Sequence, residues 1–369
     1  MGPQETTSPT GALAPSAALE VNFGRSILMV VVLCCACTQV RILPPGSPFP
    51  PRSRWEKILD GPLGSPLASD GTLVFAALST GPVMALDSAT GATVWTRPGL
   101  KPGFVVARPG LVVFVEKDGV VWGIDAQDGN GRWKTSTNVA GVESVRLDGN
   151  RVFLGGASGF AAVMASSGEL RFDLTAKGVR DIDAAGDFLA SVEDGALMVR
   201  GREDGAIRFR LASPEGEFGA PAIFPDGRLV VGSGNRLVRS VSARGAFTWR
   251  FKVGARVKDR PLDFLDGKRV GVISFEGVFY ELSLKGGDMK RRVLLSSRPF
   301  GPPALLAGRV WAPIFEDEIV AIDPRTEKLL GRTKFGGGFL SSPLLLAGRL
   351  LAEISGPRRV VALETAPVN

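Results

Sequence analysis

The stretch from Val83 to Arg97, VMALDSATGATVWTR, determines the fold, because much of the chain repeats it in modified form. It has the pattern of a strand that ends at Asp87, a turn that closes at Gly91, and a second strand that carries Trp95. The same arrangement returns 38 residues later and ends at Trp133. A fixed period of this length, with strands in each unit, is typical of the blade of a β-propeller.

Equivalents of Asp87 recur through the rest of the chain and divide it into eight units. They are Asp87, Asp125, Met164, Gly201, Val241, Leu282 or Ser283, Asp323 and Glu364. A glycine follows four residues later at Gly91, Gly129, Gly168, Gly205, Gly245 and Gly286 or Gly287. Because apolar residues replace the aspartate in some units, we expect it to stabilise a turn rather than to act as a catalytic acid.

The composition supports a sheet protein. The 369 residues are 44% apolar and 22% charged, as in an ordinary folded protein. The 47 glycines and 26 prolines separate short apolar runs, which disfavours long helices. We therefore predict an all-β fold, an eight-bladed β-propeller of four-stranded antiparallel blades.

The two ends of this propeller complement each other. The eighth unit stops near Glu364 with no room for a fourth strand, whereas Trp55 lies one period before Trp95 and has no earlier strands in front of it. We predict that the strand around Trp55 completes the last blade and closes the ring. The residues predicted to close the ring and to pack blades together are Trp55, Trp95, Trp133 and Trp249.

The N-terminus has the pattern of an export signal. An apolar run of eleven residues, 26–36, follows Arg25 and is too short to span a bilayer. Cys37 comes directly after it, in a context that resembles the lipobox of bacterial lipoproteins. We expect residues 1–36 to be a signal peptide and Cys37 to be acylated; the alternative is an ordinary cleaved signal and a soluble periplasmic protein. Residues 1–20 are polar, and a start at Val21 would make them a start-site artefact.

A proline-rich segment follows the cysteine. We interpret residues 37–53 as the lipidated cysteine and an extended tether, and residues 54–369 as the propeller. In the sorting rule that accompanies the lipoprotein resemblance, Thr38 in place of aspartate implies the outer membrane.

The missing residue types exclude much chemistry. The chain has no histidine, which removes the usual catalytic triads and most zinc sites. Its three cysteines all precede Thr38, so the predicted propeller has no thiol. We expect no catalytic residue, no metal site and no cofactor.

The formal net charge is +7, and the densest basic stretch is 250–260. This stretch is either a patch for an anionic surface or a set of solvated loop charges. No aromatic-interleaved nucleic-acid motif accompanies it, so no nucleic-acid partner is expected.

The repeated A-L-D, S-A-T-G and V-W pattern resembles the PQQ-like repeat over about residues 54–364. Together with the lipobox and tether, it resembles the propeller lipoproteins of the BAM complex for outer-membrane protein assembly. This resemblance implies a non-enzymatic, monomeric scaffold at the periplasmic face of the outer membrane, anchored by its lipid and bound to a β-barrel assembly protein or another envelope protein. It also implies a docking role for Asp181 and Asp183 on a loop between blades; the alternative is two solvated aspartates where a strand begins.

Two other functions compete with the scaffold. One is a periplasmic binding or sensor propeller for an anionic polysaccharide or peptide. The other is a quinoprotein dehydrogenase, which would use a disulfide of adjacent cysteines. Cys34 and Cys35 are adjacent, but they lie within the predicted export signal. The sequence therefore favours protein binding over enzymatic activity.

Overall fold

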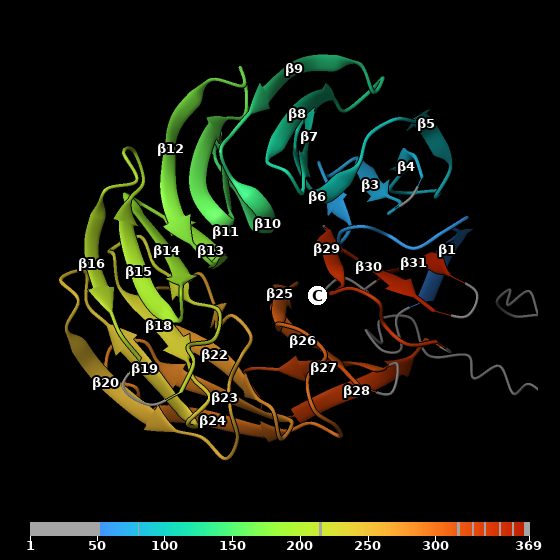
Figure 1. The fold of residues 1–369 in the computed structure, drawn as a ribbon. Coiled ribbons are helices and arrows are strands. Elements are labelled where there is room, and N and C mark those ends of the chain that lie inside the picture. Colours follow the sequence, from blue (N-terminus) through green and yellow to red (C-terminus); the bar gives the residue numbers. More distant parts are fainter. Residues whose placement is uncertain are drawn as a thin grey trace, which may run out of the picture. The chain divides into compact units, whose positions relative to one another are not determined.

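The computed structural model describes residues 52–364 except 80, 214, 215, 316, 317, 327, 336, 347, 356 and 357. The described residues form strands and turns in eight separate sheets. These sheets stand around a central axis as the blades of a ring (Figure 1). The predicted all-β, eight-bladed propeller is confirmed. The predicted signal peptide, Cys37 and nearly all of the tether lie outside the described residues.

The first four blades follow the chain in order. Blade 1 contains β2 (Ala68–Ser69), β3 (Leu73–Ala77), β4 (Val83–Asp87) and β5 (Thr93–Arg97). Blade 2 contains β6 (Pro102–Arg108), β7 (Leu111–Glu116), β8 (Val120–Asp125) and β9 (Gly131–Ser136). Blade 3 contains β10 (Ala140–Asp148), β11 (Arg151–Met164) and β12 (Leu170–Lys177). Blade 4 contains β13 (Val179–Ala185), β14 (Phe188–Glu193), β15 (Ala196–Gly201) and β16 (Ile207–Leu211).

The last four blades complete the circle. Blade 5 contains β17 (Ala222–Ile223), β18 (Leu229–Gly232), β19 (Leu237–Val241) and β20 (Phe247–Lys252). Blade 6 contains β21 (Leu262–Asp263), β22 (Arg269–Ser274), β23 (Val278–Ser283) and β24 (Met289–Leu294). Blade 7 contains β25 (Ala304–Leu306), β26 (Arg309–Ile314), β27 (Glu318–Asp323) and β28 (Lys328–Lys334). Blade 8 contains β29 (Leu344–Leu346), β30 (Arg349–Ile354), β31 (Arg359–Glu364) and, from the other end of the chain, β1 (Arg52–Ile58).

Blade 3 also has four strands, because β11 folds back on itself. Its first part pairs with β10 and its second part with β12. The N–H of Ala165, just after β11, donates a 2.9 Å hydrogen bond to the carbonyl of Asn150, just before it. The two ends of β11 therefore lie side by side. Gly159 supplies the positive φ of 123° at the turn.

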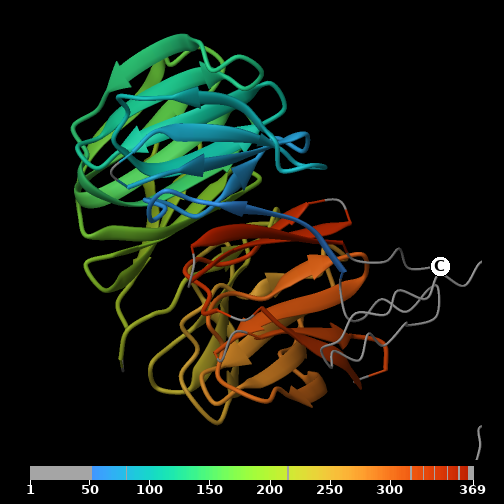
Figure 2. The same ribbon diagram turned by 90° about the vertical axis from the view of Figure 1, so that its right-hand side faces the viewer.

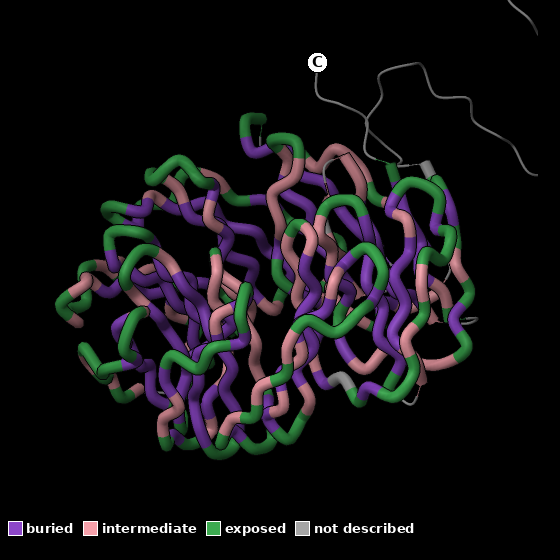
Figure 3. The backbone as a smooth tube through the Cα atoms, turned by 90° about the horizontal axis from the view of Figure 1, so that it is seen from above, coloured by how far each residue is buried: buried purple, intermediate pink, exposed green. Residues whose placement is uncertain are grey.

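The middle strands of the blades are buried, whereas along the outer strands exposed residues alternate with half-buried ones. All five residues of β3 are buried, whereas three of the five residues of β5 are exposed and the other two are half-buried. Each middle strand has a neighbouring blade on both faces, which requires an almost continuous apolar sequence. Figure 3 shows buried backbone within the strands and exposed backbone at the turns. The core thus lies between blades: one cluster contains Phe75 of blade 1 and Phe114 of blade 2.

A tryptophan on the outer strand joins each of several blades to the next. The indole N–H of Trp95 donates a 2.8 Å hydrogen bond to the carbonyl of Ala126 in blade 2. Its ring lies against Gly129, where a Cβ would come within 3.0 Å of the indole. Equivalent contacts join Trp133 to Ala165 and Gly168, and Trp249 to Leu284 and Gly287. The repeated glycine is therefore required both by its positive φ and by the ring that covers it.

The N-terminal strand closes the ring, as predicted. β1 pairs antiparallel with β31, with Trp55 opposite Ala362. The Trp55 indole N–H donates a 3.0 Å hydrogen bond to the carbonyl of Ser88 in blade 1, and its ring covers Gly91. Figure 2 shows this blue strand alongside the red strands of the last blade. One strand thus completes blade 8 and joins it to blade 1.

The turn role expected for Asp87 is confirmed. Its carboxylate accepts hydrogen bonds from the Thr90 hydroxyl at 2.8 Å and from the N–H groups of Thr90 and Ala89. The Thr90 hydroxyl is the main cause of a lowered Asp87 pKa. In the sixth unit, the hydrogen bond of Gly287 to Ser283 identifies these two residues as the equivalents of Gly91 and Asp87.

We predict that Trp55→Ala lowers the free energy of unfolding by about 3–5 kcal/mol, because it leaves a cavity where β1 joins blade 8 to blade 1. Chemical denaturation of the full chain measures the change. Ile58→Ala on the same strand is the control, since Ile58 is 65% exposed, and should have little effect. Equal stabilities of the two variants would contradict a role for Trp55 in closure.

Candidate functional site

One edge of the ring carries loops that are joined to the blades by a repeated backbone hydrogen bond. On this edge, the loop that leads into a blade accepts a hydrogen bond from the hairpin between the second and third strands of that blade. The N–H groups and their carbonyl partners are Ser79 with Pro62, Gly234 with Glu217, Phe275 with Arg256, Phe315 with Arg298, and Ser355 with Gly338. We call the edge defined by these pairs the hairpin rim.

A cavity of about 430 Å³ opens on the hairpin rim where blades 4, 5 and 6 meet. Both signs of charge line it. The lining residues are Arg180, Asp181, Glu217, Phe218, Gly219, Gly234, Arg256 and Lys258. Arg180 donates to the Asp181 carboxylate at 2.5 Å and to the Phe218 carbonyl at 3.4 Å. Asp181 thus faces the cavity already paired with its neighbour in sequence.

Asp183 lies only two residues away but has a different environment. The pairing of β13 with β14 shifts register between Arg180 and Asp183, and Asp181 has a φ of 58°. Because of this bulge the two carboxylates have different surroundings: Asp181 lines the cavity and Asp183 is buried. Asp183 is 5% exposed, on the innermost strand of blade 4. The sequence-based expectations of an inter-blade loop and of two solvated aspartates are therefore both wrong for Asp183.

The Asp183 carboxylate joins the inner parts of four blades. It lies 3.2 Å from the guanidinium of Arg146 on β10 and 3.2 Å from that of Arg260, just before β21. It also accepts a 3.0 Å hydrogen bond from the N–H of Ile223 on β17. Burial lowers the pKa of Arg260, and the charge of Asp183 counteracts this effect. The geometry makes Asp183 a structural ion-pair centre near the axis.

Asp259, next in sequence to the cavity residue Lys258, has a carboxyl group with a raised pKa. Burial raises the pKa of its carboxyl group above the ordinary value of 3.8, and the nearby charge of Asp181 raises it further. The neighbouring Lys258 partly offsets both effects.

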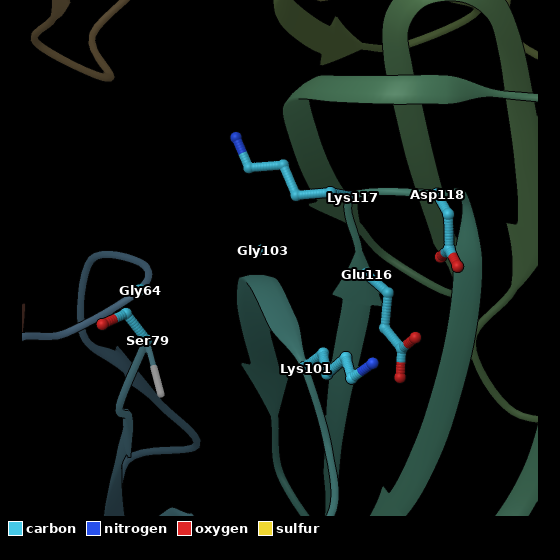
Figure 4. A pocket seen from close by; sticks show the side chains of 7 residues that line it. All are labelled: Gly64, Ser79, Lys101, Gly103, Glu116, Lys117 and Asp118. Atoms are coloured by element: carbon cyan, nitrogen blue, oxygen red, sulfur yellow. The ribbon is translucent and has the colours of Figure 1, made fainter. Parts of the chain in front are cut away.

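A second cavity, of about 420 Å³, lies on the hairpin rim between blades 1 and 2. It is lined by Gly64, Ser79, Lys101, Gly103, Glu116, Lys117 and Asp118. Figure 4 shows Gly64 and Ser79 on one side and the charged residues on the other, with the Lys117 side chain extending into the space between. Glu116 accepts a 2.9 Å hydrogen bond from the Trp122 indole. Both cavities are open and of mixed charge, which suits contact with a protein better than enclosure of a small molecule.

Metal sites and membrane spans leave distinct marks in a structure. In the part of the chain that the structure describes, no group of three or more acidic, histidine or cysteine residues is placed to hold a metal ion. No helix within the described ranges is long and apolar enough to cross a membrane.

Sequence reasoning included Arg256 in the basic stretch 250–260 but missed Phe275, Arg298 and Phe315 of the hairpin rim. Arg256 and Arg298 stack on the rings of Phe275 and Phe315. The signal was present in the sequence, because the two arginines are 42 residues apart and the two phenylalanines 40, about one repeat period.

We predict that Asp183→Asn lowers the free energy of unfolding by about 2–3 kcal/mol, because Arg260 loses its buried counter-charge while the partly exposed Arg146 regains water. Asp181→Asn is the matched control and should cost less than about 1 kcal/mol, since its pair with Arg180 is one-third exposed. Urea denaturation measures both. A larger loss for Asp181→Asn than for Asp183→Asn would refute this division of roles.

A second prediction concerns pH. The raised pKa of Asp259 favours the protonated form in the folded state, so this group stabilises the fold below its unfolded pKa and the benefit is lost as pH rises through the folded value. Asp259→Asn should therefore be more stable than wild type at pH 7 and similar to it below about pH 4. Unfolding midpoints across this range test it; a gain at pH 7 that persists unchanged at low pH would be inconsistent with titration.

Comparison with known proteins places these features in context. The family model described as outer membrane protein assembly factor BamB matches residues 51–176. The outer membrane protein assembly factor BamB of Yersinia pestis is 23% identical over 281 residues, which cover 69% of this chain. The match spans 62% of that relative, less than two thirds of its length.

Solved structures share the fold at low identity. The computationally designed Ika8 protein superposes with a TM-score of 0.71 at 15% identity, covering 83% of this chain and 98% of the other. BamB from Moraxella catarrhalis gives 0.65 at 12% identity, with 85% and 99% covered. Sqt1 from Saccharomyces cerevisiae gives 0.70 at 10% identity, with 85% and 98% covered. The resemblance found in the repeats is thereby confirmed: the chain is a β-propeller with PQQ-like repeats that is similar to the outer membrane protein assembly factor BamB.

Proposed function

We propose that this protein is a non-enzymatic, membrane-anchored scaffold that binds other proteins during outer-membrane β-barrel assembly. The observation that carries the proposal is the match of residues 51–176 to the assembly-factor model. This segment contains the closing strand β1 and nearly all of blades 1 to 3. The match therefore includes the strand that closes the ring.

The architecture supports scaffolding on physical grounds. A closed ring of blades gives a rigid body, and its hairpin rim presents exposed side chains such as Glu217, Arg256 and Arg298. The two open cavities present both acidic and basic side chains, which can pair with opposite charges on a protein partner. In this mechanism the protein holds a partner or an incoming chain in place and makes or breaks no covalent bond.

The anchoring part of the proposal rests on the sequence. A signal peptide at 1–36, a lipid on Cys37 and a tether at 37–53 would hold the propeller of 54–369 up to roughly 50 Å from the periplasmic face of the outer membrane. The structure has β1 beginning at Arg52, close to the end of this tether.

Affinity capture tests the scaffold function. The full chain with a C-terminal tag, purified from envelopes in mild detergent, should recover the central β-barrel assembly protein, identified by mass spectrometry. An unrelated tagged envelope lipoprotein is the control for non-specific recovery. Recovery of no assembly subunit would refute the proposed process.

Cys37→Ala separates anchoring from docking in the same experiment. The variant should move from the detergent phase to the aqueous phase in a Triton X-114 partition, because it lacks the acyl chains. The purified variant should still bind the captured partner. A wild-type protein that already partitions into the aqueous phase would contradict lipidation.

A further inference from the structure

Two arginines and two phenylalanines alternate along the hairpin rim of blades 6 and 7. The Arg256 guanidinium carbon lies 4.3 Å from the centroid of the Phe275 ring. The Arg298 guanidinium lies 4.0 Å from the Phe315 centroid and 5.5 Å from that of Phe275. Phe275 therefore lies near two cations. We call these four residues the Arg–Phe ladder.

Both cations of the ladder are exposed, and the described residues place no acidic group in an ion pair with either of them. Arg256 and Arg298 are exposed, whereas the two rings beneath them are half-buried. Among the described residues, neither guanidinium forms an ion pair within 4.0 Å. Two like charges that share one ring repel each other, so binding of carboxylates there is favoured electrostatically.

The fold itself does not require these residue types. The equivalent hydrogen-bonded positions are Pro62 and Ser79 in blade 1, Glu217 and Gly234 in blade 5, and Gly338 and Ser355 in blade 8. These blades close equally well with small or oppositely charged residues. Phe315 packs on Phe300, but the two exposed guanidinium groups are a local surface feature of blades 6 and 7 that core packing does not explain.

Stacking prepares the guanidinium groups for planar ligands. Each ring fixes the plane of its guanidinium, which leaves the N–H edge available for a bidentate pair with a carboxylate. Arg256 also lines the 430 Å³ cavity, where Lys258 adds a second cation near Asp181 and Glu217, so the ladder adjoins a cavity of mixed charge. We propose that the Arg–Phe ladder binds an acidic, extended segment of a partner polypeptide, an inference that rests on the proposed scaffold function.

A polypeptide fits the surroundings better than an anionic membrane. The rings are covered by the guanidinium groups and are not free to insert into a bilayer. Glu217 and Glu276 lie on the same rim, both exposed, and would repel a uniformly anionic surface. An extended peptide places alternate side chains on one side about 7 Å apart, so two carboxylates can reach two neighbouring arginines.

Fluorescence anisotropy with the purified full chain in detergent tests the proposal. The probe is a capped, fluorescein-labelled ten-residue peptide of alternating glutamate and serine; glutamine replaces glutamate in the reference peptide. The glutamate peptide should bind at least tenfold more tightly, and more weakly as salt rises. Arg256→Glu with Arg298→Glu should reduce its affinity at least tenfold. Equal binding of the two peptides, or an unchanged double variant, would overturn the proposal.

A matched control distinguishes the ladder from net charge. Arg250→Glu with Arg292→Glu makes the same charge change on exposed positions of the outer strands β20 and β24. This control should keep affinity within about twofold; an equal loss would mean that overall charge alone attracts the peptide. If the glutamate variant of the ladder does not fold, Arg256→Gln with Arg298→Gln replaces it and should still lose most of the affinity.

Vesicles separate the peptide from a lipid. Phosphatidylglycerol vesicles that bind through the ladder while the acidic peptide does not would overturn the peptide assignment. The test also separates this inference from the scaffold function. If envelope capture succeeds and peptide binding fails, the ladder is not the docking surface, whereas peptide binding without any captured assembly subunit would refute the assembly role and leave the ladder intact.

Discussion

The ring depends on one repeated contact, in which an indole from one blade lies on a glycine of the next. Trp55 covers Gly91 in this way, and Trp95 covers Gly129. The indole N–H also donates to a carbonyl of the neighbouring blade, so the contact is both apolar and directional. A side chain on the glycine would collide with the ring. Each blade thereby fixes the position of its neighbour, and Trp55 makes the series circular.

Blade 6 has no tryptophan at this position, and apolar side chains such as Phe279 and Val310 pack it against blade 7. Register alignment places Arg291 where Trp249 stands in blade 5. Arg291 pairs at 2.6 Å with Glu281, whose side chain is fully buried. Further on, a cluster that includes Trp311, Phe335 and Phe339 packs blade 7 against blade 8. The repeat therefore fades in sequence without a break in the ring, because what each interface requires is a filled, satisfied contact rather than a particular residue.

The interior and the rim of this propeller obey different constraints. Strands between blades are apolar because both of their faces are covered, and the turn aspartates serve the backbone. Exposed positions on the hairpin rim are under neither constraint, and their residues differ from blade to blade, as Glu217 in blade 5 and Arg256 in blade 6 show. Such positions are where a common fold acquires its own partners. The proposed scaffold function and the Arg–Phe ladder both belong to this edge.

The sequence by itself determined the number of blades, the closing strand and the turn role of Asp87, because these follow from patterns that recur at a fixed period within each unit. Only the tertiary structure determined that Asp183 is a buried ion-pair residue. Its partners Arg146 and Arg260 belong to other parts of the chain, and they meet it because the inner strands converge on the axis. The Arg–Phe ladder lies between these cases: its spacing is one period, but the loop conformations decide that guanidinium groups stack on rings. Periodicity specifies which blade a residue belongs to, whereas the chemistry of a surface depends on contacts between blades.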